Sequence, residues 1–123
     1  MSTSVNIGVI GAGRIGKLHA EHLAYRVPGA NILAIADIRL EAAQKCAADF
    51  QITAAYRDYR HILDDEGIEA VVICSSTDTH AQMIEEAAAA GKHMFCEKPI
   101  DFDLARIDRA LEAADKAGVK LQV

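Results

Sequence analysis

The chain has 123 residues, 51% of them hydrophobic and 25% charged, which suits one globular domain with a normal core. Its formal net charge is -5 and it has no run of Lys and Arg, which excludes nucleic acid as a main partner because phosphates need clustered cations. No segment approaches the ~20 apolar residues of a membrane span and residues 1–6 lack the pattern of a signal peptide, so we expect no membrane contact and a cytoplasmic location.

The first half of the chain alternates between short apolar segments and longer segments with helical spacing. This pattern predicts strands over residues 5–10, 32–36 and 53–56, and helices over residues 14–27, 40–50 and 58–63. Pro28 and Gly29 end the first helix. Each helix therefore joins one strand to the next.

The second half of the chain continues this alternation. The run over residues 70–74 is continuously apolar, which is typical of a parallel strand covered on both faces. A helix is expected to begin near Thr79, where Thr79 and Gln82 fit a capping box, and to end at Gly91. The remaining elements are a strand over 92–96, a helix capped by Asp101 or Asp103 that runs to residue 117 and ends at Gly118, and a strand over 119–123.

Repeated strand–helix–strand units of this length need right-handed crossovers, which make the strands parallel within one sheet. Six strands in two windings predict an α/β doubly wound parallel sheet, the Rossmann fold, with strand order 3-2-1-4-5-6. No linker or low-complexity tract divides the chain, so residues 1–123 are expected to form one domain.

A glycine-rich turn follows the first strand and opens the first helix. Gly11 allows a tight turn, Gly13 lets the backbone approach a pyrophosphate, and Gly16 lets the helix pack closely on the sheet. The helix N-terminus offers unpaired N–H groups to phosphates, so Arg14 and Ile15 join the candidate cofactor-binding residues. A strand–helix turn that binds no ligand is the alternative.

An acidic residue stands at the end of the second strand. Asp37 follows Gly16 by 21 residues, close to the spacing at which a carboxylate accepts hydrogen bonds from the adenosine ribose. A carboxylate there favours NAD, because it repels the 2′-phosphate of NADP. Arg39, beyond Ile38, keeps NADP open because a guanidinium pairs well with a phosphate. An acid in an ordinary surface turn is the remaining alternative.

Polar residues also follow the fourth and fifth strands, whose carboxyl ends should line the same crevice. Ser75, Ser76 and Thr77 offer hydroxyl groups to cofactor oxygens, although plain turn chemistry explains them equally well. His80 opens the next helix as a cofactor ligand or as a surface histidine. Glu97-Lys98-Pro99 places a lysine where it could hold a substrate hydroxyl, with a solvated loop lysine as the alternative.

The three cysteines are Cys46, Cys74 and Cys96. Their spacing contains no CxxC pair and no metal-ligand pattern. We therefore expect buried, reduced thiols and no metal site.

Four segments together resemble one oxidoreductase family. They are VIGAGRIGKLHAEHL over residues 9–23, AIADI over 34–38, TDTH over 77–80 and FCEKP over 95–99. The chain resembles the glucose-fructose oxidoreductase, inositol dehydrogenase and rhizopine catabolism (Gfo/Idh/MocA) family over nearly its whole length, and within it the myo-inositol 2-dehydrogenases. The Glu-Lys-Pro segment is the most specific element of this resemblance.

The resemblance implies an NAD(P)-dependent enzyme that oxidises a CH–OH group of a sugar or cyclitol substrate to a ketone. It implies that Lys98 binds the reacting hydroxyl and that Glu97 lies beside the nicotinamide ribose. Ile15 would pack near the nicotinamide, with its N–H near the phosphates. It further implies a cofactor cleft lined by Ser75, Thr77 and His80, with Gln122 near the nicotinamide.

Members of this family continue into a second α+β domain that carries most of the substrate pocket, and that domain is missing from residues 1–123. We therefore expect a truncated dinucleotide-binding domain that turns over no polyol alone and self-associates through the face the second domain would cover. Two other functions stay open. A non-catalytic NAD(H) sensor would not need Lys98, and an S-adenosylmethionine methyltransferase would not need the full glycine motif.

Overall fold

The computed structural model describes residues 4–123 and contains one six-stranded parallel sheet in the order β3-β2-β1-β4-β5-β6. This order confirms the predicted doubly wound Rossmann topology. The strands are β1 (Val5–Ile10), β2 (Ala30–Ala36), β3 (Ala54–Tyr56), β4 (Ala70–Ile73), β5 (His93–Cys96) and β6 (Leu121–Gln122). The helices are α1 (Arg14–Tyr25), α2 (Leu40–Phe50), α3 (Arg60–Leu63), α4 (Thr77–Ala89) and α5 (Leu104–Ala117).

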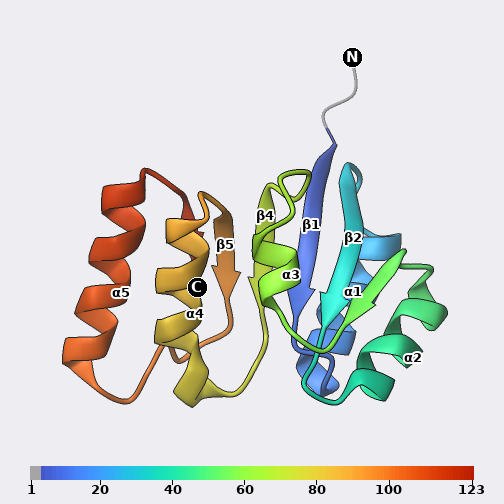
Figure 1. The fold of residues 1–123 in the computed structure, drawn as a ribbon, viewed down its shortest axis with the longest axis horizontal. Coiled ribbons are helices and arrows are strands. Elements are labelled where there is room, and N and C mark those ends of the chain that lie inside the picture. Colours follow the sequence, from blue (N-terminus) through green and yellow to red (C-terminus); the bar gives the residue numbers. More distant parts are fainter. Residues whose placement is uncertain (1–3) are drawn as a thin grey trace.

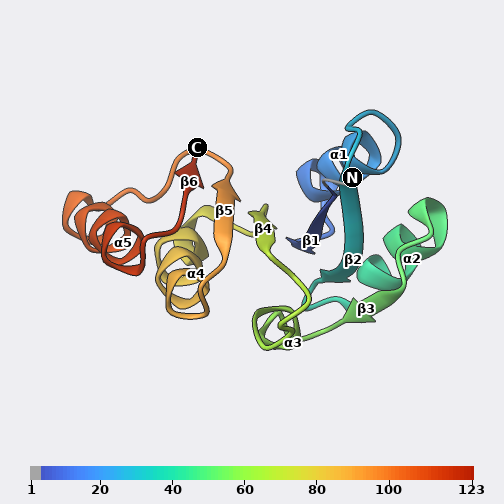
Figure 2. The same cartoon turned by 90° about the horizontal axis from the view of Figure 1, so that it is seen from above.

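Helices cover the two faces of the sheet at opposite ends (Figures 1 and 2). One face of the β1–β3 half packs against α1 and α2, whereas α4 and α5 cover the other face of the β4–β6 half. Both faces of the strand β4 are apolar. Val71 and Ile73 join the core beneath α4, and Val72 joins the core beneath α1 and α2. Successive side chains of a strand point to opposite faces, so a doubly covered strand needs a continuous apolar run.

The observed helix ends confirm several local predictions. Gly91 and Gly118 have φ of 74° and 72°, the left-handed conformation that ends a helix without a Cβ penalty. Asp103 is the residue that caps α5, where its carboxylate accepts a hydrogen bond from the Ala105 N–H at 2.9 Å. Asp101 instead accepts hydrogen bonds from the N–H groups of Phe102 and Asp103 and orders the turn before the helix.

Several predicted boundaries are shifted. The strand β2 begins at Ala30 and not at 32, α3 begins at Arg60 and not at 58, and β6 spans Leu121–Gln122 and not 119–123. The helix α1 ends at Tyr25 and not at residue 27. The helix α4 begins at Thr77 with Ser76 as its N-cap, so the predicted capping box at Thr79 does not form. The reason is that the Thr79 hydroxyl donates back to the Ser76 carbonyl at 2.6 Å, a local bond that competes with capping. Within residues 4–123, no helix is long and apolar enough to span a bilayer.

Candidate functional site

A cleft of about 320 Å³ opens where the carboxyl ends of β1, β2 and β4 meet. It brings together six of the predicted site residues: Gly11, Gly13, Asp37, Ile38, Arg39 and Ser75. Its other lining residues are Ile10, Ala36, Arg57, Tyr59, Cys74, Ser76, Thr79 and Met83. The strand order reverses between β1 and β4, so the cleft lies at the topological switch point, where doubly wound sheets bind their ligands.

The glycine turn is fixed by close backbone contacts. Gly11 has φ of 107°, and a Cβ there would lie 2.7 Å from the Cys74 carbonyl. A Cβ on Gly16 would overlap the Gly11 carbonyl, so α1 packs on the turn at a distance that only glycine permits. Gly13, the N-cap of α1, has no atom within 4 Å of its Cβ position. The turn therefore leaves an open space next to the N–H groups at the start of α1, which fits a pyrophosphate.

Asp37 holds the glycine turn against the end of β2. Its Oδ2 accepts a hydrogen bond from the Ala12 N–H, and its Oδ1 accepts one from the Arg39 N–H, both at 2.8 Å. The guanidinium of Arg39 lies 3.7 Å from Oδ1, and only 11% of the Asp37 side chain is exposed. Each carboxylate oxygen can accept a further hydrogen bond, so Asp37 can still bind the two ribose hydroxyls.

Ser75 and Thr79 form a short hydroxyl chain at the floor of the cleft. Ser75 Oγ lies 2.7 Å from Thr79 Oγ1, and Thr79 already donates its single hydrogen to the Ser76 carbonyl. Ser75 must therefore donate to Thr79. Its oxygen is left as an acceptor, which suits a ribose hydroxyl better than a phosphate oxygen.

Arg57 and Tyr59 line the cleft although they were not predicted. Both follow β3, and Arg57 comes directly after its last residue. The signal was available, because residues just past a parallel strand face the crevice, but β3 has only 3 residues and a weak pattern. The Tyr59 hydroxyl donates to Glu86 at 2.6 Å, and burial together with this contact raises the pKa of Tyr59 to about 12. Tyr59 is therefore a neutral donor that is already occupied.

Glu97 and Lys98 lie at the carboxyl end of β5. The Glu97 N–H donates to the Ile73 carbonyl at 3.0 Å, which extends the pairing of β5 with β4 beyond the strand ends. Glu97 Oε1 lies 2.7 Å from Nε2 of His19, whose ring meets Phe95 edge to face. The hydrogen bond from His19 lowers the pKa of Glu97 against a smaller opposing effect of burial. Lys98 is exposed.

The Glu97–His19 pair makes stability depend on pH at the acidic end. Folding lowers the pKa of Glu97, so the pair stabilises the fold fully at a pH above the ordinary pKa of a glutamate. This stabilisation is lost as the pH falls through the lowered pKa of Glu97. We expect Glu97→Gln to reduce the melting temperature near neutral pH by about 4 °C or less, and to flatten its decline in acid. Melting curves from neutral to acidic pH test this, with the exposed Glu112→Gln as control. An equally steep acid decline in Glu97→Gln would contradict it.

The other predicted site residues lie outside the cleft lining. Both Arg14 and Ile15 are exposed on the first turn of α1, and Arg14 lines a recess between α1 and α2 with Lys17 and Lys45. Thr77 begins α4. His80, predicted to line the cleft, is instead buried, with 2% of its surface exposed.

Gln122 lines a separate groove of about 410 Å³ over β4 and β5, beside α1, which contributes His19 and His22 to the lining. This groove is mostly apolar and also contains Leu23, Val27, Met94 and Phe95. It is larger than the cleft, but it has no phosphate-binding turn.

The three cysteines are free thiols. Burial is the main cause that raises the pKa of both Cys74 and Cys96 to about 12, so both thiols stay neutral. Cys46 is buried too. In the part of the chain that the structure describes, no three His, Cys, Asp or Glu residues are grouped so that they could hold a metal ion.

The switch-point cleft, the glycine turn and the acid after β2 define a dinucleotide-binding Rossmann domain. The model of an oxidoreductase family with an NAD-binding Rossmann fold matches residues 5–123. The chain belongs to this Gfo/Idh/MocA family.

Several relatives with similar sequences and folds are named inositol dehydrogenases. An uncharacterised oxidoreductase of Bacillus subtilis is 49% identical over 123 residues, which is 100% of this chain and 36% of the relative. The myo-inositol 2-dehydrogenase of Thermotoga maritima is 41% identical over 117 residues, 95% of this chain and 35% of the relative. The crystal structure of scyllo-inositol dehydrogenase from Lactobacillus casei with bound NAD(H) and scyllo-inositol matches with a TM-score of 0.91 and 30% identity, over 97% of this chain and 35% of that one.

Proposed function

We propose that residues 1–123 form the NAD-binding part of a dehydrogenase that oxidises a CH–OH group of an inositol-type cyclitol to a ketone. The observation that carries this proposal is the Glu97–Lys98–Pro99 segment directly after β5, on the same sheet edge as the glycine cleft. A domain that only binds a dinucleotide does not need an exposed lysine at that position. The named inositol dehydrogenases among the relatives support the substrate class.

The bound nicotinamide would supply the hydride acceptor. The N–H groups at the start of α1 would hold the pyrophosphate of the dinucleotide over Gly13. Asp37 would accept hydrogen bonds from the hydroxyls of the adenosine ribose. The Asp37 carboxylate favours NAD over NADP because it repels a 2′-phosphate, although Arg39 and Arg57 also line the cleft. Glu97, whose pKa is lowered by the hydrogen bond from His19, would accept a hydrogen bond from a hydroxyl of the nicotinamide ribose.

Lys98 would act on the substrate itself. An ammonium group that donates a hydrogen bond to the reacting hydroxyl orients its oxygen and stabilises the negative charge that grows there as the proton leaves. The chain spans about 36% of the length of these relatives, so we expect most of the substrate contacts to lie in the part of them that the match does not cover. We expect residues 1–123 alone to show no useful turnover, and the apolar groove with Val27 and Phe95 to favour self-association.

A chimera tests the proposal for Lys98. Residues 1–123 would replace the matching segment of the Thermotoga maritima myo-inositol 2-dehydrogenase, to which they are 41% identical. We expect NADH formation with myo-inositol, and a loss on the order of 100-fold or more in kcat when Lys98→Met is introduced. Lys116→Met on the exposed side of α5 is the matched control and should keep full activity. Unchanged turnover in the Lys98→Met chimera would contradict the role.

A further inference from the structure

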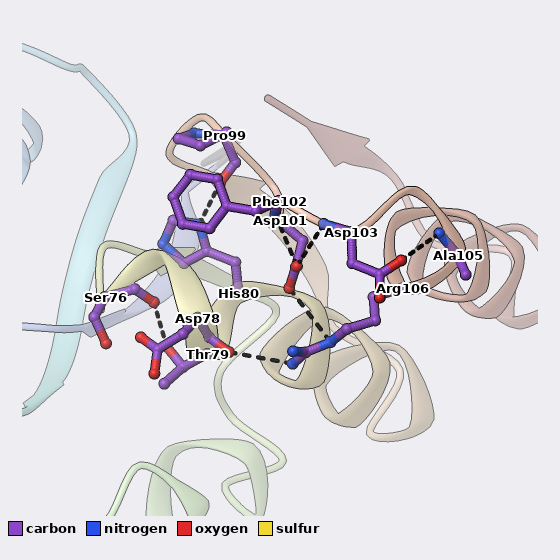
Figure 3. A network of polar contacts seen from close by, with 10 residues as sticks. All are labelled: Ser76, Asp78, Thr79, His80, Pro99, Asp101, Phe102, Asp103, Ala105 and Arg106. Atoms are coloured by element: carbon purple, nitrogen blue, oxygen red, sulfur yellow. Dashed lines mark hydrogen bonds and ion pairs between the residues drawn. The ribbon is translucent and has the colours of Figure 1, made fainter.

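His80 connects the two loops that flank the carboxyl ends of β4 and β5. It is the fourth residue of α4, and its side chain is almost completely buried. Its Nε2 lies 2.7 Å from the carbonyl oxygen of Ser75. Its Nδ1 lies 2.8 Å from that of Pro99, the contact drawn in Figure 3. One imidazole ring thus bridges the residue that lines the cleft and the residue that follows Lys98.

Both partners of the ring are hydrogen-bond acceptors. A backbone carbonyl oxygen can only accept, so each ring nitrogen must carry a hydrogen to bond it. The neutral imidazole has one N–H and the imidazolium has two. Only protonated His80 can therefore make both contacts, and the neutral ring turns a lone pair toward one of the two carbonyl oxygens.

Figure 3 shows four charged residues in the region around His80, namely Asp78, Asp101, Asp103 and Arg106. Arg106 on α5 pairs with the buried carboxylate of Asp101 at 3.4 Å and donates to the Asp78 carbonyl at 3.2 Å, so its charge is largely neutralised. The charged or titratable groups in the segments around these contacts are Asp78 on α4, Glu97, Lys98, Asp101 and Asp103 in the loop after β5, Arg106 on α5, and the neutral thiols of Cys74 and Cys96 at the strand ends.

The N-terminus of α4 opposes a positive charge on His80, whereas the two carbonyl dipoles favour it. The side chain on which the two loops depend is thus a titratable group that the proposed chemistry does not use.

We propose that protonated His80 is a positioning residue, which fixes the loop that carries Lys98 against the cofactor-binding loop at Ser75. This inference rests on the proposed NAD site, because the two loops hold opposite halves of that site. When His80 loses its proton, one of the two contacts is lost and the loops are no longer held together. Affinity for the dinucleotide then falls.

Calorimetric titration of the 123-residue chain with NAD⁺ between about pH 5 and 8 tests this directly. We expect the affinity of the wild type to fall by about tenfold as the pH rises across this range, since a hydrogen bond from a charged donor is lost. His80→Gln should bind about tenfold more weakly at the acidic end and lack this fall. The control His22→Gln, which changes a half-buried histidine of the apolar groove, should keep the wild-type profile.

Nitrogen NMR of histidine-labelled wild type keeps the inference testable if His80→Gln does not fold. We expect two ring N–H signals of His80 that exchange slowly with water at acidic pH, one of which disappears on titration. Bound NAD⁺ should retain that proton to higher pH, because linkage is reciprocal. Fast exchange of both protons, or equal pH profiles for wild type and His80→Gln, would overturn the inference. No binding of NAD⁺ at any pH would instead refute the proposed function, with the ring signals still reporting on the two contacts.

Discussion

Replacing Gly13 by alanine is expected to remove most NAD⁺ binding and to leave the fold intact. Gly13 has φ of -76°, which alanine adopts freely, and its Cβ position has no protein atom within 4 Å. The added methyl group therefore occupies the space that a pyrophosphate needs beside the start of α1. We expect a loss of affinity on the order of 100-fold, with a change of about 1 kcal/mol or less in the free energy of unfolding.

Two measurements on the same sample separate these effects. Calorimetric titration gives the affinity for NAD⁺, and urea denaturation gives the free energy of unfolding. Wild-type affinity in Gly13→Ala would mean that the dinucleotide lies elsewhere. A large loss of stability would mean that the open space at Gly13 serves folding and not a ligand.

Gly16→Ala is expected to act mainly on the fold and to cause a large loss in the free energy of unfolding. The new Cβ would overlap the carbonyl group of Gly11, and both partners belong to a turn that Gly11 N–H and Asp37 already tie to β2. Backbone atoms cannot move aside as a flexible side chain does, so α1 must shift on the sheet. We expect a loss of about 2–4 kcal/mol in the free energy of unfolding, which lowers the melting temperature by roughly 10 °C.

Gly13→Ala is the matched control for this substitution, because it adds the same methyl group three residues away in the same turn. Thermal melts of the two variants should differ clearly, and Gly16→Ala should also bind NAD⁺ weakly because the start of α1 is displaced. A melting temperature for Gly16→Ala within a degree or two of the wild type would contradict the close packing of α1 on the turn.

Strand order and the main part of the cleft could be predicted because they depend on short-range patterns. The continuous apolar run at β4 and the spacing between Gly16 and Asp37 are local properties, and the right-handed crossover rule then fixes the topology. The same holds for Gly118, whose φ is set by the end of one helix.

What could not be predicted depends on contacts between distant segments or on competing hydrogen bonds. The Thr79 hydroxyl contacts both the Ser75 hydroxyl and the Ser76 carbonyl, and the sequence pattern does not indicate that it donates to the carbonyl. The buried ring of His80 contacts the carbonyl of Pro99, 19 residues further along the chain, and no local pattern indicates this contact. Tyr59 reaches the cleft through the packing of the segment after β3, which its weak strand pattern does not indicate.

Amide chemical shifts during an NAD⁺ titration of the 123-residue chain test the central claim most directly. If the cleft at the carboxyl ends of β1, β2 and β4 binds the dinucleotide, the largest shifts should fall on residues 11–16, 37–39 and 74–76, with smaller ones at 97–99. NADP⁺ should cause the same pattern at higher concentration. No saturable shifts, or shifts centred on the apolar groove around Val27, Met94 and Gln122, would contradict this account.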